Sequence, residues 1–363
     1  KVYDPSGTHP AEVNGAAGPI AQPIRATSFR YCDPASIPPR EWLYGRRLMR
    51  GYVAMTAAQG GIGKTTVSVT EALAMVTGRA LLGDIPHRPL TVWHWNGEDD
   101  ADEMTRRYAA AMIRHHISHD DLGGRLYLDS GRDQPILITS QPAGTTVAEP
   151  IEVALIDTIR ALEIDVLIID PFVSTHTAPE SDNAAIDAVM GTWRRIAHAT
   201  KCAIELVHHT RKMAPGVART IEDMRGASSM LAAARDARLF ARMTPEEAAT
   251  LGIEEAHAWR HFRVADTKAN MAPPPERATW MRLESVDLGN ATAERPADSV
   301  GVATQFTPSA TFDGVSHAAI DRVMRAIGAS GECRRDERAT AWVGHLIGDV
   351  LGIDVRSPIG KGQ

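Results

Sequence analysis

The stretch "YVAMTAAQGGIGKTTVSVTEALAMV", residues 52–76, places a glycine-rich turn between two apolar segments. The apolar run before the turn predicts a buried strand, and the apolar residues after it recur at the spacing of an α-helix. In such a turn the backbone amides of Gly60, Gly61, Gly63 and Lys64 can point inward at a phosphate, aided by the N-terminus of the following helix. The order strand, glycine turn, helix therefore predicts a phosphate-binding loop.

Gly63, Lys64 and Thr65 complete the Gly-Lys-Ser/Thr end of the P-loop pattern, while Ala58 stands where its first glycine usually lies. In this pattern the lysine binds β- and γ-phosphate oxygens and the next hydroxyl holds Mg²⁺. We therefore predict that Lys64 and Thr65 take these roles, and that Thr66 joins the phosphate-binding set. The expected ligands are ATP and Mg²⁺. The alternative is a glycine turn that precedes a helix by chance.

Short apolar runs alternate with helical stretches from Trp42 to about residue 236. This rhythm predicts an α/β fold with a mostly parallel, twisted sheet and helices on both faces. The last helical stretch of the series is "ASSMLAAARDA", residues 227–237. Three strand-like segments follow, "ARLFARM", "WRHFRVADTKAN" and "ATWMRLESVDL", with one short helix among them. We expect these segments to add antiparallel strands to the edge of the sheet.

Four regions are expected along the chain. Residues 1–40 hold seven prolines and little periodicity, which predicts an irregular arm. Residues 41–288 form the nucleotide-binding domain, and residues 289–314, which are small and polar, are predicted to be a linker. Residues 315–363 contain two amphipathic helices, "SHAAIDRVMRAIGAS" and "DERATAWVGHLIGDVLG". These two helices form a small appendage that either docks on the main domain or begins a further helical domain.

Composition limits the classes of function. The net charge of −6 makes no global polycation, so any contact with nucleic acid is local. Cys32, Cys202 and Cys333 lie far apart in sequence, which argues against a disulfide framework and a structural zinc site. We find no apolar run of about 18 residues and no signal-like start. We therefore expect a cytoplasmic protein with no membrane partner.

A carboxylate at the tip of a buried strand is the second part of a P-loop site, and "DVLIIDP" supplies it. Four apolar residues end in Asp170, which we predict to hold Mg²⁺ together with Thr65. Pro171 follows directly, so the group that orients the attacking water must come from another strand. The segment "LTVWHWNGEDD" offers Glu98, with Asp99 as a second candidate. The alternative is that this acidic run only begins a helix.

The segment "LVHHTRK" carries a third candidate strand tip. Either His208 or His209 could sense the γ-phosphate, although a histidine at a strand end is more often structural. The loop that follows is locally basic, with the cations Arg211, Lys212, Arg219 and Arg225. This composition suits an electrostatic grip on a nucleic-acid backbone, and the alternative is a solvated surface loop.

The motifs "GGIGKTT", "NGEDD", "LIIDP", "HHTRK", "RGASSMLAAAR" and "VADTKANMAPP" occur together in one order. In this order and spacing the chain resembles the RecA-like ATPases, and most closely the RepA-type hexameric replicative helicases of plasmids, phages and mobile elements. The resemblance runs from about residue 50 to 285. It implies a RecA-like P-loop NTPase core and six-membered rings with ATP bound between subunits. In related chains a C-terminal tail of this kind begins a winged-helix domain.

The resemblance also implies roles for single residues. Glu98 matches the catalytic carboxylate, His208 or His209 the phosphate sensor, and residues 210–225 the pore-facing DNA loop. Arg235, in the helix after "RGASS", matches the arginine finger that a neighbouring subunit supplies, and Lys268 matches a second cation supplied in the same way. Without the resemblance, Arg235 could equally lie on an ordinary charged helix face.

Three functions are weighed from these observations. The first is an ATP-driven ring motor, a hexamer as the resemblance implies, that acts on single-stranded DNA together with replication or mobile-element proteins. The second is an ATP-gated DNA-binding or regulatory protein of a mobile element that assembles on DNA without unwinding it. The third, a metabolic kinase, is disfavoured because the sequence shows no arginine cluster typical of a lid.

Overall fold

The structure is a computed structural model that describes residues 26–138, 149–210, 230, 234–271, 278–308, 317–331, 333–336 and 338–355. Tertiary contacts divide the chain after Arg40. The part of the predicted arm that is described, residues 26–40, is exposed and contains one 3-10 turn, Pro34–Ser36. Residues 1–25 of that arm lie outside the described residues.

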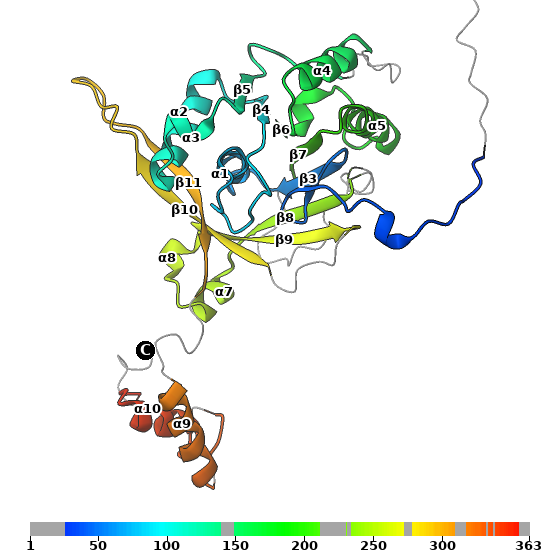
Figure 1. Ribbon diagram of the computed structural model, residues 1–363. Coiled ribbons are helices and arrows are strands. Elements are labelled where there is room, and N and C mark those ends of the chain that lie inside the picture. The colour runs from blue at the N-terminus through cyan, green and yellow to red at the C-terminus, as the bar shows by residue number, and fades with distance from the viewer. Residues whose placement is uncertain are drawn as a thin grey trace, which may run out of the picture. The chain divides into compact units, whose positions relative to one another are not determined.

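A nine-stranded sheet forms the centre of the second unit, in the order β11-β10-β9-β8-β3-β7-β6-β4-β5 (Figure 1). The strands from β8 to β5 in this order pair in parallel, and β9, β10 and β11 continue the sheet in antiparallel pairs. This arrangement confirms the predicted α/β fold with a mostly parallel sheet and antiparallel edge strands. The strands are β3 (Val53–Ala58), β4 (Val92–Asn96), β5 (Leu126–Ser130), β6 (Val166–Asp170), β7 (Ala203–His209), β8 (Asp236–Arg242), β9 (His261–Ala269), β10 (Thr279–Asp287) and β11 (Ser299–Phe306).

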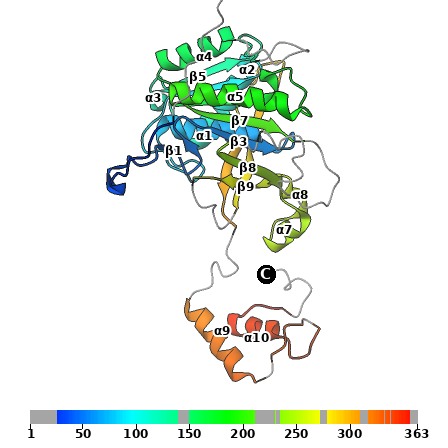
Figure 2. The same cartoon turned by 90° about the vertical axis from the view of Figure 1, so that its right-hand side faces the viewer.

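Helices cover both faces of the parallel part of the sheet (Figures 1 and 2). Side chains alternate along β3, so Val53, Met55 and Ala57 join the core on one face, whereas Ala54 joins the core on the other. The first core includes side chains of α4 and α5, and the second includes those of α1 and α2. The helices of this region are α1 (Lys64–Thr77), α2 (Ala101–His115), α3 (His119–Leu122), α4 (Glu149–Ala161), α5 (Asn183–Thr200) and the 3-10 helix η2 (Phe172–Thr175).

Smaller elements complete the second unit. A hairpin of β1 (Trp42–Tyr44) and β2 (Leu48–Met49) precedes β3, and the short helices α7 (Pro245–Thr250) and α8 (Glu255–Ala258) join β8 to β9. Two helices near the C-terminus, α9 (His317–Ala329) and α10 (Val343–Leu351), pack against each other. Within the described residues, no helix is long and apolar enough to cross a membrane.

The predicted linker over residues 289–314 is wrong for Ser299–Phe306, which form β11. This strand pairs with β10 over its whole length. Val302 is buried in the core shared with α1 and α2, and Ala303 is buried in a separate core with Phe262 and Met281. Small residues suit this position because the strand approaches both helices closely. The expectation for "ARLFARM" also needs correction, since β8 pairs with β3 in parallel rather than antiparallel.

Two predicted helices differ from the structure. The expected helix that contained Arg235 does not reach this residue, which lies in a bend just before β8. Pairing of β8 with both β3 and β9 overrides the helical propensity of the alanine-rich sequence. The second C-terminal helix begins at Val343 rather than near residue 336. There the Arg334 amide donates to the carbonyl oxygen of Ala341, and the Val343 amide donates to the carbonyl oxygen of Arg334, across a short β-bridge.

Candidate nucleotide-binding site

The glycine-rich turn between β3 and α1 requires glycine at two positions. Gly61 has φ +72° and Gly63 has φ +114°, a backbone region in which other residues are strained. A Cβ on Gly63 would also lie only 3.1 Å from the side chain of Leu283 on β10. The helix begins at Lys64, so Thr65 and Thr66 lie in its first turn, where amides have no acceptor within the helix. The turn thus presents amides at the carboxyl end of β3.

Lys64 is held inside this turn. Its side chain is buried, and Nζ donates to the carbonyl oxygens of Ala58 at 2.9 Å and Gln59 at 3.0 Å. Burial lowers the pKa of the Lys64 amino group to about 8, while the nearby carboxylates of Asp170 and Glu98 act in the opposite direction. An ammonium that is partly stripped of water next to free amides is suited to bind an anion such as a phosphate.

Asp170 ends β6 beside the turn and has the properties of a magnesium ligand. The residue is 2% exposed, and burial raises the pKa of its carboxyl group to about 6, opposed by a hydrogen bond from Thr65 and by the charge of Lys64. Its Oδ2 atom has no hydrogen-bond partner within the described part of the chain. A buried carboxylate oxygen without a partner, beside a hydroxyl, fits a hard cation such as Mg²⁺. Asp170 and Thr65 would hold this ion, which supplies charge neutralisation for the phosphates when it is bound.

The two histidines at the end of β7 have different surroundings. His209 contacts two other site residues, with Nδ1 3.2 Å from Lys64 Nζ and Nε2 3.6 Å from Glu98 Oε1. His208 points to the opposite face, where its ring lies 6.5 Å from the ring of Phe172. Burial lowers the pKa of His208 to about 4, so its ring is neutral near pH 7. Of the two candidates, His209 is therefore the one on the phosphate side.

The acidic run after β4 divides into two parts. Asp100 caps the N-terminus of α2 by accepting from the Glu103 amide, so the interpretation as a helix start holds from this residue onward. Glu98 and Asp99 precede the helix. The Asp99 carboxylate forms an ion pair with Arg107 at 2.9 Å, whereas the Glu98 carboxylate faces His209 and is 59% exposed. Glu98 is thus the carboxylate that stands at the mouth of the site.

Arg235 and Lys268 lie at the amino edge of the sheet, where the parallel strands begin. The Arg235 amide donates to the carbonyl oxygen of Val53 at the start of β3, and Lys268 pairs with Ala237 at the start of β8. From Val53 to the end of β3 the chain rises about 17 Å, which is more than twice the reach of an arginine side chain. Neither cation can therefore reach the glycine-rich turn of its own chain.

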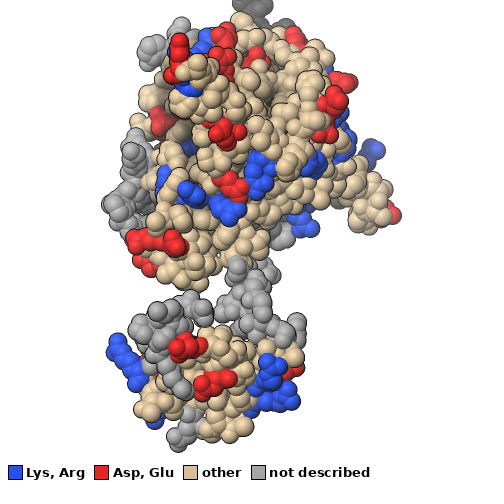
Figure 3. Space-filling model, turned by 90° about the vertical axis from the view of Figure 1, so that its left-hand side faces the viewer, with Lys and Arg blue, Asp and Glu red and all other residues tan. Residues whose placement is uncertain are grey.

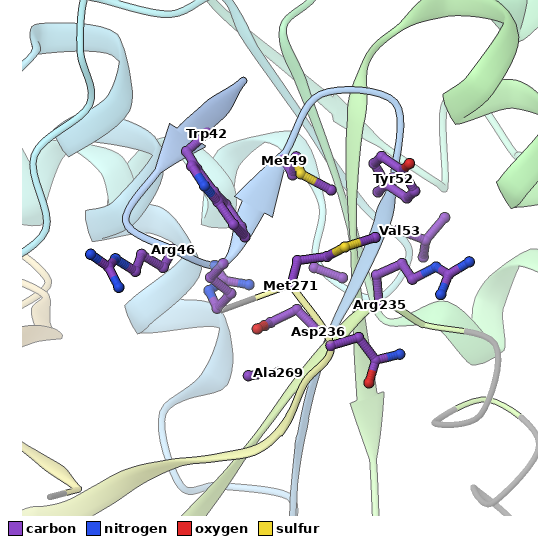
Figure 4. Close-up of a pocket in the computed structure, with 12 residues that line it drawn as sticks. Trp42, Arg46, Met49, Tyr52, Val53, Arg235, Asp236, Ala269 and Met271 are labelled. Atoms are coloured by element: carbon purple, nitrogen blue, oxygen red, sulfur yellow. The ribbon is translucent and has the colours of Figure 1, made fainter. Parts of the chain in front are cut away.

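Figure 4 shows the pocket that Arg235 helps to line at this amino edge. Trp42 lies on one side of the pocket, and the Arg235 guanidinium points away from it on the other. Asp236 lies between them, and burial raises the pKa of its carboxyl group to about 7. Burial and the nearby Arg235 lower the pKa of Lys268, so two cations gather here.

A buried ionic network under the turn was not predicted from the sequence. Arg238 on β8 binds both oxygens of Glu71 on α1 at 2.6 Å, and Glu71 also pairs with Arg47. Arg47 pairs in turn with Glu205 on β7, which accepts from Thr56 on β3. The only signal in the sequence is that single charged residues interrupt apolar runs, as in "CAIELVHH". The network connects α1 to β3, β7 and β8, the elements that carry the site.

The four predicted DNA-binding residues, Arg211, Lys212, Arg219 and Arg225, lie outside the described residues. On the face shown in Figure 3, acidic and basic side chains are interspersed rather than separated. Among the residues that the structure describes, no group of histidine, cysteine or acidic side chains forms a dedicated metal cluster.

The comparison with protein families agrees with this geometry. The model of a family described as "AAA domain" matches residues 21–215, which is more than half of the chain. The chain belongs to this AAA-domain family. An AAA domain is a P-loop ATPase, and the match includes the turn, Glu98, Asp170 and His209. The match ends before Arg235 and Lys268. No curated protein matches the chain.

Proposed function

We propose that this AAA-domain ATPase works as a ring motor on single-stranded DNA, in the manner of the RepA-type replicative helicases that its motifs resemble. The position of Arg235 and Lys268 carries the proposal. Both cations lie at the amino edge of the sheet, about 17 Å from the carboxyl edge where Lys64 lies. A second copy of the chain, docked with its carboxyl edge against this amino edge, could receive both cations in its phosphate site.

In this proposal each chain supplies the binding half of a site. Lys64 and the amides of Gly60, Gly61, Gly63 and Thr66 hold the phosphates, Glu98 positions the attacking water, and His209 lies between Lys64 and Glu98 so as to respond to the γ-phosphate. The neighbour supplies Arg235 and Lys268 to neutralise the charge that develops on the transferred phosphoryl group. A head-to-tail contact of this kind closes into a ring when its rotation allows.

The experiment that tests the motor uses DNA in two forms. Single-stranded DNA should stimulate ATP hydrolysis, and the protein should unwind a forked duplex in the presence of ATP and Mg²⁺. Binding of DNA without stimulation or unwinding would contradict the motor and favour an ATP-gated assembly on DNA. Sizing the protein with and without a nonhydrolysable ATP analogue would show whether the nucleotide drives assembly.

The basic residues that follow β7 in the sequence, Arg211, Lys212 and Arg219, support DNA as the partner through their charges. Neutralising these three residues should weaken binding of single-stranded DNA and flatten its dependence on salt. Each phosphate contact that is lost lowers the slope of log affinity against log salt by roughly 0.7. Binding measured from low to high salt checks this prediction, with Arg194→Ala, an exposed arginine on α5, as the control. An unchanged slope would exclude these three residues as contacts to the DNA phosphates.

A further inference from the structure

Three side chains of the phosphate site, those of Asp170, Glu98 and His209, lie on one side of β3. Asp170 ends β6, Glu98 follows β4 and His209 ends β7, and these strands stand together in the sheet order. In the proposed function they surround the place of the γ-phosphate and its Mg²⁺ ion. The ribose and base of such a nucleotide would then extend toward the other side of β3, where β8 and β9 lie.

The segment that joins β8 to β9 reaches the carboxyl edge of the sheet at this place (Figure 1). Arg242, the last residue of β8, connects the segment to the glycine-rich turn. Its Nη2 atom donates to the carbonyl oxygen of Gly61 at 2.6 Å, and Nη1 donates to the carbonyl oxygen of Trp259 at 3.5 Å. One guanidinium thus connects the backbone of the turn to the backbone of Trp259.

Trp259 is a large aromatic side chain that is exposed beside a small apolar core. The segment has its own small core, in which Ala258 and Met243 are buried, but Trp259 beside them is 57% exposed. The guanidinium of Arg260 lies over the Trp259 ring, 5.3 Å from its centroid. The backbone of Arg260 is fixed, because its carbonyl oxygen accepts from the Leu283 amide on β10. An exposed indole with a guanidinium at its face forms a flat, cationic platform on a rigid base.

We propose that Trp259 and Arg260 bind the purine base of the nucleotide whose phosphates occupy the glycine-rich turn. The indole stacks on the base, and the guanidinium adds a second planar cation that can stack or donate to ring nitrogens. Continuity with the phosphate site, through Arg242, favours this occupant over a neighbouring chain. The inference rests on nucleotide binding by the AAA domain and is independent of any action on DNA.

The test compares a ligand that has the base with one that lacks it. Binding of a nonhydrolysable ATP analogue and of inorganic tripolyphosphate is measured on the full chain with Mg²⁺. Trp259→Ala should weaken the analogue roughly tenfold, as expected from the loss of one base stack, and leave tripolyphosphate unchanged. Arg260→Ala should weaken the analogue about threefold, as for an exposed cation–π contact. Trp259→Phe should retain most of the affinity for the analogue.

Controls separate the base platform from other roles. Ile113→Ala removes a second exposed apolar side chain, on α2, and should change neither affinity. Equal losses for the analogue and tripolyphosphate in Trp259→Ala would overturn the proposal, because the turn itself would then be disturbed. An unchanged affinity for the analogue, with or without a change in oligomeric state, would also overturn it. Failure of DNA to stimulate hydrolysis would contradict the proposed motor function but not the binding of the base by Trp259 and Arg260.

Discussion

Glu98 and Asp99 are adjacent carboxylates with different surroundings at the residue scale. Glu98 faces His209, whereas Asp99 is engaged by Arg107. We predict that Glu98→Ala lowers the rate of ATP hydrolysis by about a hundredfold or more, as for removal of a general base, while ATP still binds. Asp99→Ala is the matched control and should retain most of the rate. The reverse result, with Asp99→Ala inactive and Glu98→Ala active, would contradict this prediction and show that Asp99 orients the water.

Asp236 provides a pH dependence at the same scale. Burial raises the pKa of its carboxyl group to about 7, with Asp266 adding to the shift and Arg47 opposing it. For a carboxyl group whose pKa is raised on folding, the stabilising contribution is complete at low pH and is lost as pH rises through the folded value.

The prediction is therefore a change in relative stability with pH. From about pH 4 to pH 7 the free energy of unfolding of the wild type should fall relative to that of Asp236→Asn, by up to about 4 kcal/mol. Urea unfolding of both proteins at several pH values measures this difference. A difference that stays constant across this range would show that Asp236 is charged in the folded protein throughout.

Single residues at strand ends were predictable because parallel strands end at one edge of a sheet. This rule was enough to bring Lys64, Asp170 and Glu98 together from segments far apart in sequence. It could not decide between His208 and His209, because this choice depends on which face of β7 each side chain occupies. Trp259 gave no signal in the sequence, since its place beside the turn depends on one contact through Arg242.

At the scale of elements, the buried ionic network joins α1 to the strands of the site. Glu71 is 5% exposed and pairs with Arg238 and Arg47, which are also buried. We predict that Glu71→Ala lowers the free energy of unfolding by about 3–5 kcal/mol, because two buried guanidinium groups lose a partner. Urea unfolding checks the value. The matched control is Asp187→Ala, which removes an exposed ion pair with Arg194 and should cost about 1 kcal/mol or less.

A loss for Glu71→Ala as small as that for Asp187→Ala would mean that the network contributes little to the fold.

The helices and strands themselves were mostly predictable from periodicity, with two instructive failures. Small, polar residues around Ser299 favoured a linker, although the strand there is specified by pairing with β10. Alanine-rich sequence before β8 favoured a helix, although pairing on both sides makes residues from Asp236 onward a strand.

For the whole molecule, the central claim is that ATP is hydrolysed between two copies of the chain. Lys64 and Arg235 lie at opposite ends of the same parallel strands, so an Arg235 that neutralises the phosphoryl charge must come from a second chain. Sequence patterns could identify both residues but not the distance between them, because the direction of β8 relative to β3 had to be known. Arg235→Ala alone should lower the rate of hydrolysis by about 10³ to 10⁵, as for loss of an arginine finger, while ATP still binds.

The most direct measurement mixes two inactive variants, Arg235→Ala and Glu98→Ala, and follows ATP hydrolysis against their ratio. Sites formed by the Glu98 of one variant and the Arg235 of the other would be intact. We predict that hydrolysis returns on mixing, at most to about a quarter of the wild-type rate when the chains assemble at random around a head-to-tail ring. Arg235→Ala protein that hydrolyses ATP at the full rate by itself, or mixtures that stay inactive at every ratio, would contradict a site shared between chains.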